Sequence, residues 1–77
     1  MKLESITEIL TTIRQYNTAI IIHTFSKDGI YLIRARCIPS TSTIELTFLI
    51  EQRVELFDSI AEAVKIVELQ VNSPHNA

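Results

Sequence analysis

The sequence has few of the residues on which structural and catalytic motifs are built. Its 77 residues include one glycine, two prolines, one cysteine and no tryptophan. The single Cys37 excludes a disulfide scaffold, and a single glycine excludes the glycine-rich phosphate-binding loops, which need several. The apolar run from Ala19 to Ile22 is far too short to span a membrane. Glu4 and Glu8 stand where a secretion signal would have its basic and apolar regions, so we expect a cytoplasmic protein.

Apolar residues are abundant, and they place the chain among proteins that fold. They make up 47% of the sequence, against 21% charged residues and a net charge of −2. A chain of this length forms one domain, and it buries only about 60% of the surface that its unfolded form exposes. We expect a single compact domain over residues 1–72 and a flexible tail over 73–77, in which Pro74 ends the preceding helix.

The first segment has the pattern of an amphipathic helix. Ser5 and Glu8 form a capping box, in which each side chain binds a free backbone N–H at the start of a helix. The sequence therefore predicts a helix over residues 5–16. Apolar side chains recur along it at spacings of three and four residues, which place them on one face: Leu3, Ile6, Ile9, Leu10 and Ile13.

The middle of the chain is rich in isoleucine and threonine, and such β-branched residues favour strands. We predict three strands, over residues 18–25, 30–37 and 43–50. Asp28-Gly29, which contains the one glycine, is a strong signal for a hairpin turn. Pro39 cannot donate a hydrogen bond to a strand ladder, so it belongs to the loop between the second and third strands.

The segment after residue 50 admits two interpretations. A second capping box, Ser59 with Glu62, predicts a helix that begins at Ser59 and leaves 53–57 extended, as part of the third strand or a short fourth one. Glu51-Gln52 lacks the residues that tight hairpin turns require, so one long helix over 51–72 is the favoured interpretation. Its apolar residues follow a heptad-like spacing: Ile50, Val54, Phe57, Ala61, Val64 and Val71.

The predicted fold is α+β, with the order α-β-β-β-α: a three-stranded antiparallel meander with two helices packed on one face. Pairing the second strand with the third places Tyr31, Ile33, Ala35 and Cys37 on the covered face. The same register puts Arg36 across from Glu45 on the open face, a stabilising opposite-charge pair.

The first strand has two possible faces. A two-residue turn at Asp28-Gly29 directs Ile20 and Ile22 inward, together with Thr24, and directs Phe25 outward. A three-residue loop with a bulge reverses the two faces. The sequence alone leaves both alternatives open.

In either case the open face carries more apolar side chains than contact with water requires. An apolar patch rimmed by charge is typical of an interface, and arginine beside apolar neighbours is typical of binding hot spots. The plainer alternative is that these isoleucines and leucines only favour strand formation. Our hypothesis is a small protein-binding regulator, adaptor or inhibitor, which binds a second copy or another protein. The predicted partner-binding residues are Ile21, Phe25, Leu32, Arg34, Arg36 and Leu49.

We expect no enzymatic activity, cofactor, metal centre or small-molecule substrate. Cys37 and His23 are the one plausible pair of nucleophile and base. The predicted strands separate them by about 10 to 13 Å, which is too far for a dyad, so Cys37 is better read as a small buried apolar residue. With His75 in the tail, the histidines are distant and lack the spacing of a zinc site.

Two other functions compete with this hypothesis. The order α-β-β-β-α is also that of double-stranded-RNA-binding modules, but the order alone assigns no family. Residues 51–72 hold five acidic residues against Arg53 and Lys65, and this net charge of −3 would repel phosphates where the second helix begins. The third possibility is a structural subunit of a larger assembly, which an apolar sheet face would also serve.

Overall fold

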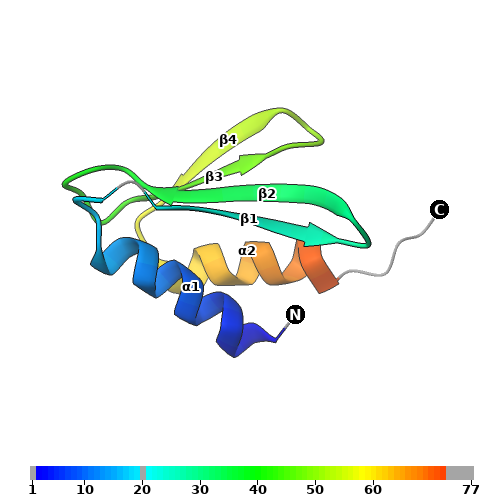
Figure 1. Cartoon of the computed structure of the whole chain (residues 1–77), viewed down its shortest axis with the longest axis horizontal. Helices are drawn as coiled ribbons and strands as arrows, with labels where there is room; N and C mark the ends of the chain where they lie inside the picture. Colours follow the sequence, from blue (N-terminus) through cyan, green and yellow to red (C-terminus); the bar gives the residue numbers. More distant parts are fainter. Residues whose placement is uncertain (1, 20, 73–77) are drawn as a thin grey trace.

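The computed structural model describes residues 2–19 and 21–72, and it shows an α+β domain with two helices and a four-stranded antiparallel sheet (Figure 1). Both helices lie on one face of the sheet, as predicted, and the other face is open. The predicted tail at 73–77 lies outside the described residues. The elements, in chain order, are α1 (Leu3–Gln15), β1 (Ile22–Lys27), β2 (Ile30–Cys37), β3 (Ile44–Phe48), β4 (Arg53–Phe57) and α2 (Ile60–Asn72).

The strands form a meander in the order β1-β2-β3-β4, so each strand pairs with its neighbour in sequence. The predicted bounds of β2 are confirmed, and so is its register with β3. Ile33 lies opposite Phe48, and Arg36 lies opposite Glu45. Alternation of apolar and polar side chains was enough to fix this register, because a shift by one residue would exchange the two faces.

The favoured long helix over 51–72 is wrong, and the alternative with a short fourth strand is correct. Residues 49–52 form a turn, and Arg53 then pairs with Phe48 to start β4. Gln52 closes this turn with a φ of 54°, a left-handed conformation that glycine or asparagine usually adopts. A glutamine in that position carries no recognisable turn signal, which is why the sequence pattern concealed the hairpin.

The two predicted capping boxes have different outcomes. The Oγ atom of Ser59 accepts a hydrogen bond from the backbone N–H of Glu62 at 3.3 Å, just before α2. This confirms that the last helix starts after Ser59. By contrast, α1 begins at Leu3, so Ser5 lies within the helix and makes no cap. Lys2 takes the capping position, and no side-chain hydrogen bond supports it.

A β-bulge decides which face of β1 is buried. The turn has two residues, because Lys27 pairs with Ile30, and Asp28 and Gly29 both have positive φ angles. Farther along, Phe25 pairs with Ile33 but Ser26 pairs with Tyr31, so Leu32 has no partner in β1. This extra residue reverses the alternation. The predicted place of Tyr31 on the covered face is therefore wrong, and its side chain is 66% exposed.

The structure therefore combines the turn of the first alternative with the faces of the second. Ile22 and Thr24 share the open face with the arginines opposite them, and Phe25 lies under the helices. Ile20 lies outside the described residues.

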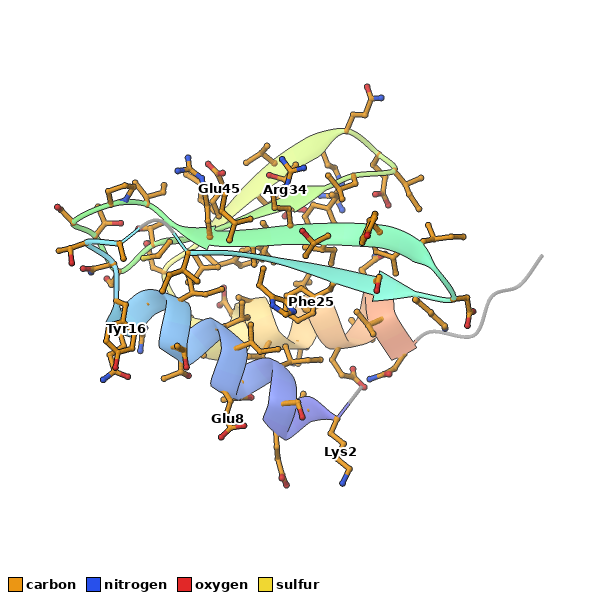
Figure 2. All side chains as sticks on the ribbon, in the orientation of Figure 1. Lys2, Glu8, Tyr16, Phe25, Arg34 and Glu45 are labelled. Carbon is orange, nitrogen blue, oxygen red and sulfur yellow. The ribbon has the colours of Figure 1, made fainter. Side chains whose placement is uncertain are left out.

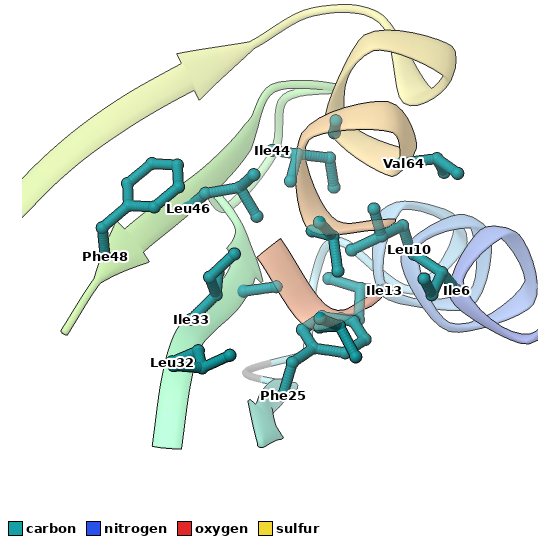
Figure 3. Packing of buried hydrophobic residues seen from close by; sticks show 14 of the residues in the cluster. Ile6, Leu10, Ile13, Phe25, Leu32, Ile33, Ile44, Leu46, Phe48 and Val64 are labelled. Carbon is teal, nitrogen blue, oxygen red and sulfur yellow. The ribbon is translucent and has the colours of Figure 1, made fainter. Parts of the chain in front are cut away.

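The core fills the space between the helices and the covered face of the sheet (Figure 3). The bulge lets two successive side chains of β2, Leu32 and Ile33, enter this core together. Phe25 on β1 and Phe48 at the end of β3 supply the largest buried side chains. The other buried residues are Ile6, Leu10, Ile13, Ala35, Cys37, Ile44, Leu46, Ala63, Val64, Val67 and Val71.

Candidate protein-binding face

The open face of the sheet carries two rows of side chains that cross all four strands. Figure 2 shows Arg34 and Glu45 on the side that faces away from the helices. The face is therefore built by strand register alone, and no helix or loop of the described residues contributes to its centre. From β1 to β4, one row is Ile22, Arg36, Glu45 and Leu56, and the other is Thr24, Arg34, Thr47 and Val54.

An ion pair holds the middle of the first row. Nε of Arg36 donates to Oε1 of Glu45 at 2.7 Å, and Nη2 donates to Oε2 at 3.2 Å. This two-point contact fixes the plane of the guanidinium. The hydrogen bond with Glu45 also raises the pKa of Arg36 above its usual value, because it stabilises the charged form of the guanidinium.

The second row holds a charge without a partner. Arg34 is exposed, and it forms no hydrogen bond or ion pair with any other residue in the ranges 2–19 and 21–72. Because Glu45 is engaged by Arg36, the centre of the face carries one net positive charge. An exposed guanidinium on an open sheet face can reach an external carboxylate with little rearrangement.

Three apolar side chains flank this charged centre. On β1, Ile22 is 52% exposed. On β4, Val54 is 56% exposed and Leu56 is 59% exposed. Single exposed apolar residues are ordinary on a protein surface. Here they border one face from both edges of the sheet, around a charged centre, which is the arrangement typical of an interaction patch.

Of the six predicted partner-binding residues, only the two arginines lie in these rows. Phe25 is 1% exposed and Leu32 is 7% exposed, so both belong to the core and their predicted place on the open face is wrong. Ile21 is half-buried and packs against the core. Leu49 is half-buried in the turn after β3, where its N–H donates to the carbonyl of Leu32.

Sequence reasoning missed the three apolar residues of the face. Ile22 was assigned to either face, depending on the turn at Asp28-Gly29. Val54 and Leu56 were assigned to a helix, although their alternation with Arg53 and Glu55 is the period-2 pattern of a strand. That alternation, taken together with the cap at Ser59, was the available signal.

Cys37 and His23 lie closer together than predicted but do not contact each other. His23 pairs with Ala35, two residues along β2 from Cys37, and this diagonal relation separates the two residues by about 7–8 Å. The thiol of Cys37 instead donates to the carbonyl of Thr41 at 3.1 Å, and the His23 ring packs edge-on against Phe25. No cluster of three potential metal ligands occurs within the described part of the chain. His75 lies outside that part.

A second concave surface lies between the two helices. It is a mostly apolar groove, and Lys65 and Glu68 border it. The apolar stripe predicted for the first helix begins at Leu3, and this residue is exposed and lines the groove. The groove is lined by Leu3, Thr7, Ile60, Ala61, Val64, Lys65 and Glu68.

The fourth strand gives the chain the order α-β-β-β-β-α, which differs from the order of double-stranded-RNA-binding modules. No family model, curated protein or solved structure matches this chain. In the described ranges, neither helix is long and apolar enough to cross a membrane. Function must therefore be argued from the surface of this chain.

Proposed function

We propose that this protein is a non-enzymatic regulator, adaptor or inhibitor of the cytoplasm, and that its open sheet face binds another protein. One observation carries the proposal: among the described residues Arg34 has no partner, and exposed apolar side chains border it on the same face. Arginine is enriched at the energetic centres of interfaces, and exposed apolar side chains supply the surrounding burial.

The chemistry of the face defines the partner that it fits. The partner would present a flat apolar surface with a carboxylate near its centre. That carboxylate would bind Arg34, while Ile22 and Leu56 would be covered. Because the Arg36–Glu45 pair is already satisfied, it would contribute mainly to orientation rather than to affinity.

The proposal can be tested with charge-reversal variants on opposite sides of the molecule. Arg34→Glu changes the charge at the centre of the open face. Lys2→Glu makes the same change of charge before α1, on the helix side of the molecule (Figure 2). Both positions are exposed, so both variants should fold, and circular dichroism checks this. Partners are captured from the source cell, identified, purified and titrated against the wild type and both variants.

We expect Arg34→Glu to weaken binding of the purified partner by about tenfold or more, which corresponds to about 1.4 kcal/mol. Lys2→Glu should bind as the wild type does. Equal binding by Arg34→Glu and the wild type would contradict the proposal. Retention of the wild-type chain on heparin at physiological salt would instead favour the nucleic-acid hypothesis.

A further inference from the structure

The β4 strand is an edge of the sheet with charges of both signs on one side. Its outer edge presents backbone N–H and C=O groups that no other strand of the described sheet binds. Arg53 and Glu55 both point to the covered side of the sheet and form an ion pair with each other. The guanidinium of Arg53 lies 4.1 Å from the centre of the Phe48 ring, which holds the arginine in place.

These two charged side chains remain accessible. The side chain of Arg53 is 49% exposed and that of Glu55 is 41% exposed, because the helices pack mainly against the other end of β4, at Phe57. Figure 1 shows β4 at the border of the sheet, opposite α1. Another strand could approach this edge without displacing a helix.

We propose that β4 pairs with β4 of a second copy of this chain, antiparallel, about a two-fold axis at Val54. In this register Arg53 of each copy lies directly opposite Glu55 of the other. The edge is therefore self-complementary: in addition to the ion pair within each copy, one pairing brings both charges of each copy opposite a charge of the other sign. Val54 lies opposite Val54 of the second copy, on the open face.

The charges select this register over its neighbours. A two-fold axis at Glu55 would put that carboxylate opposite itself, and like charges in this position are destabilising. An axis at Leu56 would place Glu55 opposite Phe57 and leave Arg53 beyond the paired segment. The axis at Val54 is the one of these three that matches opposite charges.

The other edge of the sheet offers no such match. Within β1, Lys27 is the only charged residue, so an antiparallel copy of β1 would bring no carboxylate opposite it. Pairing at β4 would also join the two open faces into one continuous eight-stranded surface. The dimer therefore leaves Arg34 free, and it neither requires nor excludes the partner proposed above.

Charge reversal at Arg53 and Glu55 tests the pairing. In a dimer of Arg53→Glu, the introduced carboxylate of each copy would lie opposite Glu55 of the other copy. In a dimer of Glu55→Arg, the introduced guanidinium of each copy would lie opposite Arg53 of the other copy. Each variant alone should raise the dimer dissociation constant about tenfold or more, measured by analytical ultracentrifugation. An equimolar mixture should form a heterodimer, because every pair across the axis is then opposite in charge. Circular dichroism confirms that both variants fold.

The register is tested by cysteine cross-linking. Opposed Cα atoms of antiparallel strands lie about 4.5–5.5 Å apart, within reach of a disulfide. Val54→Cys should therefore form a covalent dimer under mild oxidation. Leu56→Cys is the matched control, because its counterpart would lie about 13 Å away along the strands. The native Cys37 is buried, so we expect it to form no cross-link in either variant.

A covalent Val54→Cys dimer, together with rescue by mixing, supports the proposal. It is overturned if the wild type stays monomeric up to its solubility limit, if Arg53→Glu dimerises as the wild type does, or if Leu56→Cys cross-links faster than Val54→Cys. Arg34→Glu should leave the dimer unchanged. Loss of the dimer in that variant would overturn pairing at β4 and indicate contact through the open face.

Discussion

The bulge in β2 can be tested with two matched leucine truncations. Leu32→Ala and Leu56→Ala remove the same atoms from strands of the same sheet. In a regular hairpin Leu32 would lie on the open face, as Leu56 does. With the bulge, Leu32 is 7% exposed and Leu56 is 59% exposed. The two substitutions should therefore differ widely in their effect on stability.

The expected size follows from burial. Truncating a buried leucine to alanine costs about 2–5 kcal/mol, and a lower value of about 2–3 kcal/mol suits a side chain at the border of the core. A domain of this length has a free energy of unfolding of roughly 4–12 kcal/mol. The Leu32→Ala variant should therefore lose a large part of it, and its Tm should fall by about 10–20 °C. Leu56→Ala should cost about 0.5 kcal/mol.

Urea denaturation followed by circular dichroism measures both values, at a protein concentration low enough to keep the chain monomeric. With a slope of about 1 kcal/mol per molar urea, the Leu32→Ala midpoint should fall by about 2–3 M. The Leu56→Ala midpoint should fall by about 0.5 M. Equal losses in the two variants would refute the bulge and with it the assignment of the β1 faces.

Three further predictions concern local structure, and each is measured by thermal or urea unfolding. Ser59→Ala should cost about 1 kcal/mol because it removes the cap of α2, whereas Ser5→Ala should cost nothing measurable, since Ser5 caps no helix; equal losses would show that α1 starts at Ser5. Gln52→Gly should stabilise the β3–β4 turn by about 0.5–1 kcal/mol, because glycine adopts the left-handed conformation of residue 52 without strain. Destabilisation by this substitution would contradict the positive φ angle of Gln52. A double-mutant cycle on Arg36→Gln and Glu45→Gln should give a coupling of about 0.5 kcal/mol that weakens in high salt, and a coupling of zero would mean that the pair does not form in solution.

Sequence patterns predicted the parts of this fold in which one local signal acts alone. The β2–β3 register followed from clean alternation, and Arg36 and Glu45 came out opposite each other. The capping signal of Ser59 and Glu62, which needs only four consecutive residues, indicated the start of α2 in the alternative interpretation, although one long helix over 51–72 was the favoured one. In both places local preference and tertiary packing agree.

The errors arose where two structural solutions share one pattern. Tyr31, Leu32 and Ile33 are all apolar, so the sequence contains no sign of which residue leaves the alternation at the bulge. The segment 51–57 fits both a heptad and a strand, and the turn that decides between them uses Gln52 in place of glycine. These two errors account for the misplaced site residues. Phe25 and Leu32 were predicted on the open face but lie in the core, and Val54 and Leu56 of β4 were not among the predicted partner-binding residues.

The meander order also has a consequence for how the chain folds. Every strand pairs with the one before it, so the sheet forms by closing short loops, each of which costs little entropy. The packing of α1 against α2 is different, because it joins the two ends of the described chain. Such distant contacts slow folding more than hairpins do. We therefore expect the hairpins to form early, and the docking of the two helices to complete the core.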